Sequence, residues 1–290
     1  MDQAVTLRSM TEKLAPYGAL APVATRVIAV SSGKGGVGKT NSVVNLAVAF
    51  SKMGKRVLIL DADLGLGNLD VLLGLTPKYN IGHLLRGEKT LSEVLVRGPE
   101  NILILPASSG VHELTDLGVE DRLSLQSALE NMDIDIDIMI IDTGAGISSN
   151  VLFFNTAAQE IVVVVTPEPT SITDAYALMK VLYQRHGERR FKLLVNTVRS
   201  ESDALGVYKK ISLAAERFLG ISVDFLGFVL NDANVPKAVI RQKAVLDIYP
   251  DSKASRCYCD IAETIDSLPA DDTLKGGIQF FWRQVLEREF

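Results

Sequence analysis

Short apolar runs recur along the chain, and each is followed by a segment with helical periodicity. The runs are residues 26–31, 56–61, 102–105, 137–142, 161–166, 191–196 and 223–230. Several of them, residues 161–166 among them, are apolar on both faces, which is the pattern of strands buried inside a parallel sheet. The alternation predicts an α/β fold with a doubly wound, mostly parallel sheet and helices on both faces.

One central domain is expected, because no long Gly/Ser or charged linker divides the chain. It is predicted to span residues 26–275. Residues 1–25 are predicted to form a short helix and a linker, since Pro and Gly separate a helical stretch from the first strand. Residues 276–290, which open with the pair Gly276-Gly277, are predicted to form a final amphipathic helix.

The composition narrows the class of protein. The formal net charge is −5, which disfavours a general nucleic-acid binder, because such proteins rely on a basic surface. No signal peptide and no run of about 18 apolar residues is present, so we expect a cytoplasmic protein whose membrane contact is at most peripheral. The only cysteines, Cys257 and Cys259, provide no disulfide framework and are expected to be reduced.

A glycine-rich loop follows the first predicted strand and precedes a helical segment at residues 41–53. It fits the pattern G-x-x-x-x-G-K-[ST] of a phosphate-binding P-loop. Its glycines let backbone N–H groups turn towards phosphate oxygens, and the helix N-terminus adds its positive end. Lys39 is expected to reach the β and γ phosphates of a nucleotide, and the Thr40 hydroxyl to coordinate Mg²⁺. The loop residues predicted to bind nucleotide are Gly33, Lys34, Gly35, Gly36, Val37, Gly38, Lys39 and Thr40.

Two of the apolar runs end in a carboxylate, Asp61 in the second and Asp142 in the fourth. An acid at the end of an apolar strand is the Walker B feature of P-loop enzymes, so Asp142 is predicted to hold Mg²⁺. Asp63 follows Asp61 by two residues. Carboxylates at strand ends also serve as helix caps, and that alternative stays open for all three.

Lys34 gives the loop a second lysine, in the form Lys-Gly-Gly-Val-Gly-Lys-Thr. This form resembles the deviant Walker A ATPases, the group that includes MinD and ParA. In that group the extra lysine crosses the interface of a nucleotide-sandwich dimer to the partner's phosphates. The resemblance therefore implies a homodimer that forms with ATP and couples dimerisation to hydrolysis. ATP and ADP are favoured over guanine nucleotides, because the Asn-Lys-x-Asp pattern of GTPases is absent.

The resemblance extends to both switch segments. Residues 61–70 are very similar to the first switch of that group, which implies that Asp61 holds the Mg²⁺ shell through water and that Asp63 orients or activates the attacking water. Residues 143–147 resemble the second switch, whose glycines allow it to move when the γ phosphate leaves. Asn196 matches the position that contacts adenine, and Asn231 falls in the other base-facing loop. Asn at a strand end is also a common turn former.

The first eight residues match the Asp-Gln-Ala-x-x-Leu-Arg motif that opens FlhG, also called FleN or YlxH. In this family the segment is an activator helix that stimulates FlhF, a GTPase of the signal-recognition-particle type. The resemblance implies that Gln3 and Arg8 contact FlhF, and that the protein regulates flagellar number and placement. Other partners implied are flagellar C-ring switch proteins and, in some lineages, the transcriptional activator FleQ. The second switch reads Thr-Gly-Ala where MinD carries Ser-Pro-Ala, which also favours FlhG.

The last predicted helix has one apolar face. At 100° per residue five large side chains fall within an arc of roughly 140°. They are Ile278, Phe281, Trp282, Val285 and Leu286. This face resembles the C-terminal membrane-targeting helix of MinD and FlhG, which implies binding of the ATP dimer to the inner face of the cell membrane, with a cell pole as one expected location. Packing of the same face on its own domain is the alternative.

Three other functions share part of these features. A ParA-type DNA partitioning ATPase would add a basic surface, which the acidic balance disfavours. A MinD-type division-site ATPase has no reason to carry the motif at residues 2–8. An iron-sulfur carrier would place its cysteines within the core, whereas Cys257 and Cys259 are late in the chain and spaced C-x-C.

Overall fold

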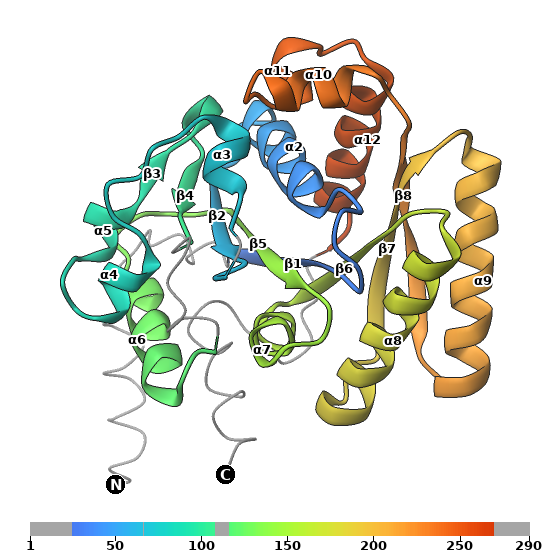
Figure 1. The fold of residues 1–290 in the computed structure, drawn as a ribbon, viewed down its shortest axis with the longest axis horizontal. Coiled ribbons are helices and arrows are strands. Elements are labelled where there is room, and N and C mark those ends of the chain that lie inside the picture. Colours follow the sequence, from blue (N-terminus) through green and yellow to red (C-terminus); the bar gives the residue numbers. More distant parts are fainter. Residues whose placement is uncertain (1–24, 66, 108–115, 270–290) are drawn as a thin grey trace, which may run out of the picture.

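The computed structural model describes residues 25–65, 67–107 and 116–269 (Figure 1). Within them an eight-stranded sheet has the order β3-β4-β2-β5-β1-β6-β7-β8. All neighbouring strands are parallel except β3 and β4. The strands are β1 (Arg26–Ser32), β2 (Val57–Ala62), β3 (Val96–Arg97), β4 (Leu103–Leu105), β5 (Ile138–Ala145), β6 (Glu160–Val165), β7 (Arg190–Val198) and β8 (Ser222–Leu230). The predicted fold class is confirmed.

Helices cover both faces of the sheet (Figure 1). On one face α2 and α12 pack against each other, with α10 and α11 beside them, and α6 to α9 lie on the other. The helices are α2 (Lys39–Lys52), α3 (Leu69–Leu73), α4 (Ile81–Leu85), α5 (Leu91–Val94), α6 (Val119–Glu130), α7 (Ser149–Ala157), α8 (Pro169–His186), α9 (Glu201–Leu219), α10 (Asn234–Ile240), α11 (Val245–Ile248) and α12 (Lys253–Ser267).

The double covering explains the continuous apolar runs. Along β1, Ile28 and Val30 pack in the cluster that contains α2, whereas Val27 and Ala29 pack in the cluster on the opposite face. Successive side chains of a strand point to opposite faces, so both sets must be apolar when helices cover both. The centre of the sheet is therefore rigid, and the strand ends that build the site are held from both sides.

Three predicted strand ends were wrong, each because the strand continues further. Asp142 is not the last residue of its strand, since β5 runs on to Ala145, which pairs with Ser32 of β1. Asn196 is followed by two more residues of β7, and β2 extends one residue beyond Asp61. The strands continue past the ends of the apolar runs because their next residues still pair with neighbouring strands, as Ala62 does with Thr143 and Val198 with Leu230.

The sequence also missed the antiparallel edge strand β3, because two residues are too short to show a period. The predicted N-terminal helix with Gln3 and Arg8 lies outside the described residues. The predicted C-terminal apolar face also lies outside the described residues; it consists of Ile278, Phe281, Trp282, Val285 and Leu286. The two terminal helices and the domain limits therefore stay predictions. Among the residues that the structure describes, no helix has the length and apolar character needed to cross a membrane.

Candidate active site

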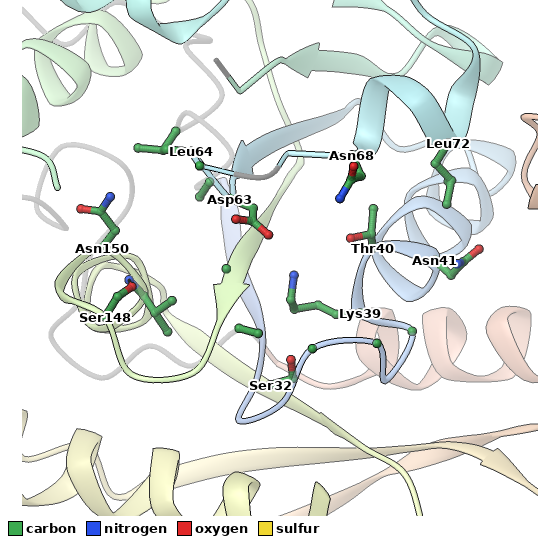
Figure 2. A pocket seen from close by; sticks show the side chains of 18 residues that line it. Ser32, Lys39, Thr40, Asn41, Asp63, Leu64, Asn68, Leu72, Ser148 and Asn150 are labelled. Atoms are coloured by element: carbon green, nitrogen blue, oxygen red, sulfur yellow. Dashed lines mark hydrogen bonds between the residues drawn. The ribbon is translucent and has the colours of Figure 1, made fainter. Parts of the chain in front are cut away.

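A cavity of about 860 Å³ opens at the carboxyl edge of the sheet, beside the loop between β1 and α2 (Figure 2). Its walls come from that loop, from the segment after β2 and from the β5–α7 connection. Figure 2 shows Lys39 and Asp63 pointing into the same space from opposite walls, with Thr40 at the start of α2. Parallel strands all end at one edge, so residues far apart in sequence meet here.

The glycines of the loop bring backbone close to this space. Gly36 and Gly38 have φ angles of 78° and 87°, in the left-handed region that favours glycine. A Cβ atom on Gly33 would lie 2.1 Å from the backbone carbonyl of Asp174 in α8, so no side chain fits there. Helix α2 begins at Lys39, directly after the loop. The loop thus ends in a helix N-terminus, the geometry that binds phosphate.

Two buried carboxylates lie beneath the cavity and share one lysine. Asp61 of β2 and Asp142 of β5 are paired neighbours on adjacent strands. The Nζ atom of Lys39 lies 2.9 Å from Oδ1 of Asp142, and both side chains are nearly inaccessible to solvent. Burial raises the pKa of Asp61 well above its usual value, and repulsion from Asp142 adds to this. Burial also raises the pKa of Asp142, against the attraction of Lys39.

This donor set fits a divalent cation. One ammonium group does not balance two carboxylates, and the Thr40 hydroxyl bonds Asp142 from the start of α2. Mg²⁺ is commonly held by one or two carboxylates together with phosphates and water. Within residues 25–65, 67–107 and 116–269, no group of three or more His, Cys, Asp or Glu side chains is arranged to hold a metal ion by itself.

Asp63 lies where the two switch segments meet. Its backbone N–H donates to Oδ1 of Asp61 at 3.2 Å. A Cβ atom on Gly144 of β5 would lie 3.5 Å from Oδ1 of Asp63, so the carboxylate rests against the second switch. Gly67 packs against Asp61 in the same way, because a Cβ atom there would lie 2.8 Å from its Oδ2. A shift of either predicted switch segment would therefore change the surroundings of a carboxylate of the site.

Lys34 is at the open side of the loop. Its Nζ atom bonds Oε2 of Glu168 at 2.8 Å and Oγ1 of Thr170 at 3.0 Å. Glu168 and Thr170 were not foreseen from the sequence. The available signal was their place directly after β6, because that strand ends at the same edge of the sheet.

Asn196 lies inside β7, two residues before its end, and Asn231 directly follows β8; both are outside the lining of the main cavity. The amide of Asn196 is buried and donates to the carbonyl of Val37 at 2.8 Å. The backbone N–H of Asn231 donates to the carbonyl of Val198 at 2.8 Å, and its side chain is exposed. Contact of either residue with adenine stays a prediction.

Other polar residues of the cavity had not been predicted. Asn150, at the second position of α7, lines it and accepts a hydrogen bond from the backbone of Leu117 at 3.0 Å. Asn68 lines it from the first switch. No spacing rule distinguishes these residues from ordinary helix-start asparagines, so only the folded structure places them.

The loop offers N–H groups to an anion, whereas the two acids beneath it need a cation. A nucleoside triphosphate with Mg²⁺ supplies both the anion and the cation. In addition, the carboxylate of Asp63 lines the cavity, where it could act on a water molecule beside the phosphates. Fold and site together therefore define the class of P-loop nucleotide hydrolases.

Comparison with known proteins gives the family. Residues 25–193 match the family described as AAA domain. The chain is 42% identical over 270 residues to the antiactivator FleN of Pseudomonas aeruginosa, covering 93% of this chain and 96% of that protein. It is 32% identical to the flagellum site-determining protein YlxH of Helicobacter pylori, with 91% and 90% covered.

Solved structures agree with this assignment. MinD from Pyrococcus horikoshii, complexed with Mg-ADP, superposes with a TM-score of 0.69 at 25% identity, covering 84% of this chain and 96% of that one. The MinC:MinD complex of Aquifex aeolicus gives 0.68 at 28% identity, with 84% and 98% covered. The chain belongs to the FlhG family, whose members are also called FleN and YlxH, within the MinD/ParA-type ATPases. It is an ATP-binding ATPase, as the motifs predicted.

Lys39 alone does not neutralise both Asp61 and Asp142, and this leads to a prediction about the stability of the nucleotide-free protein. Because the pKa of Asp61 is raised in the folded state, its favourable contribution is present at low pH and is lost as the pH rises through the raised pKa. We expect Asp61→Asn to abolish hydrolysis and to stabilise the nucleotide-free, metal-free protein at neutral pH by about 0.5–2 kcal/mol. Urea unfolding in EDTA at several pH values measures this.

The stability gain should shrink as the pH falls below the raised pKa of Asp61, and it should be lost in the ordinary aspartate range, where this side chain is protonated in the unfolded chain as well. The exposed Asp133 provides the matched control, since Asp133→Asn should leave stability unchanged. An Asp61→Asn protein that is less stable than the parent at every pH contradicts the description of this site.

Proposed function

We propose that the chain is an ATP-dependent dimerising switch that hydrolyses ATP to ADP, binds the membrane as the ATP dimer, and regulates flagellar number and placement by stimulating the FlhF GTPase. The proposal that ATP drives dimerisation rests on the position of Lys34, which is exposed at the open side of the phosphate loop. Its ammonium group bonds Glu168 and Thr170 and Lys34 does not line the cavity of its own chain, so we take the side chain to be available to a second copy.

The contact that holds Lys34 in the single chain is weak. The side chains of Lys34 and Glu168 are 39% and 63% exposed, and exposed pairs of this kind contribute about 0–1 kcal/mol. A triphosphate carries several negative charges, so it attracts the ammonium group more strongly than one solvated carboxylate does. Exchange of Glu168 for a partner's phosphates is therefore energetically favourable.

The surface around the loop suits a second copy. Gly35 and Gly36 are exposed, and Ile147, in the β5–α7 connection, leaves 52% of a large apolar side chain in solvent. An interface on this side would bury Ile147 and both loop glycines while it brings the second Lys34 to the phosphates. Burial of an apolar side chain at such a contact favours dimerisation.

Each residue of the site then has a defined part. Lys39 binds phosphate when it leaves Asp142, and Thr40, Asp61 and Asp142 hold the magnesium ion. Bound Mg²⁺ supplies charge neutralisation of the phosphates. Asp63 orients the attacking water and accepts its proton, because it is the half-exposed carboxylate on the cavity wall. The partner's Lys34 stabilises the charge that develops on the transferred group.

This assignment predicts the behaviour of two variants in size-exclusion chromatography with ATP. Asp63→Ala should form a stable dimer with little turnover, because water is no longer oriented. Lys34→Ala should be monomeric, also in the Asp63→Ala background, and should hydrolyse ATP about 10²-fold or more slowly.

The exposed Lys180 on α8 serves as the control, and Lys180→Ala should dimerise and hydrolyse like the parent. If Lys34→Ala protein pairs with ATP and turns it over as the parent does, the dimer proposal is wrong.

The flagellar part of the proposal rests on the similarity to FleN and YlxH along most of the chain and on the motif at residues 2–8. Gln3 and Arg8 are proposed to contact FlhF from a short tethered helix, which can dock in a groove and present polar groups. C-ring switch proteins and a FleQ-like activator are proposed as further partners, with action at a cell pole.

Deletion of residues 1–14 tests the FlhF contact. The truncated protein should keep its own ATPase rate, because the site begins after β1, but FlhF should hydrolyse GTP at its unstimulated rate. A Gln3→Ala/Arg8→Ala double variant should behave in the same way, whereas Lys13→Ala should stimulate normally. A synthetic peptide of residues 1–14 should restore stimulation. FlhF stimulation by the truncated protein at the parental level rules the contact out.

Membrane binding depends on the predicted C-terminal face. Burial of its five large side chains contributes roughly 1.5–3 kcal/mol each when complete, and ordering about twelve residues costs about 1 kcal/mol or more apiece. One helix therefore binds marginally, whereas two helices on an ATP dimer bind together with a multivalent gain.

Flotation with phosphatidylglycerol-containing liposomes measures this dependence. The Asp63→Ala protein should float with ATP and stay in solution with ADP, and truncation at Gly276 should abolish flotation. Trp282→Ser should weaken it, because it removes the largest side chain of the apolar face, while Gln284→Ser serves as the control. Equal flotation of ADP, ATP and truncated samples would reject membrane recruitment by this helix.

A further inference from the structure

A groove of about 680 Å³ lies between α5 and α6, away from the nucleotide cavity. Leu84 of α4 and Leu91 of α5 are buried in its wall. Leu123 of α6 and Ile134, which follows this helix, also line it and are 42% and 39% exposed. Within the described part of the chain no element covers these two side chains. Large apolar side chains left open in a groove indicate a surface that binds a partner.

The rim of the groove is polar without being charged over most of its length. It carries four hydroxyl groups, those of Thr90, Ser92, Ser124 and Ser127. An apolar groove of this kind accepts the apolar face of an amphipathic helix, and the rim can bond polar side chains at the edge of that face.

The N-terminal segment leaves the described structure beside this groove. Thr25 is the first described residue, and its Oγ1 donates to the carbonyl oxygen of Ile136 at 2.8 Å. The backbone N–H of Arg26 donates to the carbonyl of Asp137 at 2.9 Å. Ile134 of the groove is only two residues before Ile136. Residues 15–24 can span up to about 35 Å when extended, so a helix at residues 2–14 can reach the groove.

The C-terminal segment leaves on the other side of β1. Its last described residues, Leu268 and Pro269, lie in a different pocket, with Lys192 of β7 and Asp224 of β8. In the sheet β7 and β8 are on one side of β1, whereas β5, which follows the groove residues along the chain, is on the other. The N-terminal segment is therefore the nearer occupant.

The sequence of the N-terminal segment fits the groove. At 100° per residue, Ala4, Leu7, Met10 and Leu14 fall within an arc of about 120°. Gln3 falls inside the same arc. A helix whose apolar face is in the groove therefore covers Gln3 as well, and the hydroxyls of the rim can bond its amide.

We propose that the groove between α5 and α6 is a docking site for the chain's own helix at residues 2–14. Docking withholds Gln3 from any partner, so the docked helix cannot act on FlhF; this consequence rests on the proposed function, whereas docking itself does not. A tethered helix has an effective concentration of roughly millimolar, so even a weak contact keeps the groove occupied. A partner that binds the same face must first displace the helix.

Disulfide formation in the full-length, nucleotide-free protein tests docking. The two natural cysteines are replaced by alanine. Leu7→Cys with Ser127→Cys, an exposed position of the groove, should cross-link within one chain under mild oxidation. Glu12→Cys, on the opposite face of the helix, should react with Ser127→Cys at least about tenfold more slowly. Leu7→Cys with Glu216→Cys, exposed on α9, is the second control and should be equally slow.

The other occupants of the groove are outcomes of the same experiment. Equal rates for Leu7→Cys and Glu12→Cys mean that the segment touches the groove without docking, and they overturn the proposal. Faster cross-linking of Ser127→Cys to Trp282→Cys assigns the groove to the C-terminal segment and overturns it too. A cross-linked dimer whose yield rises with protein concentration assigns the groove to a second copy, with the same consequence.

Stimulation of FlhF tests whether docking withholds the helix. Leu123→Ser/Ile134→Ser should slow the Leu7→Cys cross-link and should reach half-maximal stimulation of FlhF at about three- to tenfold lower concentration, because the free helix is more populated. Leu213→Ser, on α9 at a side chain that is 64% exposed, should match the parent in both assays. Unchanged half-maximal stimulation despite a slowed cross-link overturns the withholding. If the parent does not stimulate FlhF at all, the proposed function fails, and the cross-link rates still decide the docking.

Discussion

Lys39 is buried against Asp142, and a second buried carboxylate, Asp61, lies beside Asp142 on the neighbouring strand. Three ionisable groups taken out of water with a net negative balance are costly unless something neutralises them. The rest of the site follows from this. The loop above presents N–H groups and Thr40 presents a hydroxyl, so a phosphate with its cation completes what the protein alone leaves unbalanced.

This imbalance connects chemistry with motion. Asp61 and Asp63, in the predicted first switch, lie against Gly67 and Gly144, so the carboxylates are placed by backbone segments and not by long side chains. For the proposed switch, this means that a change of charge in the cavity would act on carboxylates that touch both predicted switch segments. Because the centre of the sheet is packed from both sides, the connections at its carboxyl edge are the parts that can respond.

The proposed biological role uses the same edge. Lys34 in the loop and Ile147 in the β5–α7 connection are exposed in segments that build the cavity, where the proposed second copy would dock. The two predicted effector segments, residues 1–25 and 276–290, lie at opposite ends of the sequence. A P-loop indicates that a nucleotide is bound and hydrolysed, but it does not indicate the biological role. In the proposal that role depends on the two terminal segments, as expected when one ATPase fold serves several functions.

The sequence by itself determined the fold class, the phosphate loop, the two strand acids and the family. These are local signals: apolar runs of strand length, a glycine spacing that fixes a backbone turn, and acids next to strands. Tertiary structure decided where the strands end, because β5 and β7 continue past Asp142 and Asn196 through pairing with their neighbours. It alone joined Lys34 to Glu168 and Asn196 to Val37, contacts between residues more than a hundred positions apart. Sequence patterns record the period and the turn preference of one segment at a time, whereas such contacts depend on which strands become neighbours when the sheet forms.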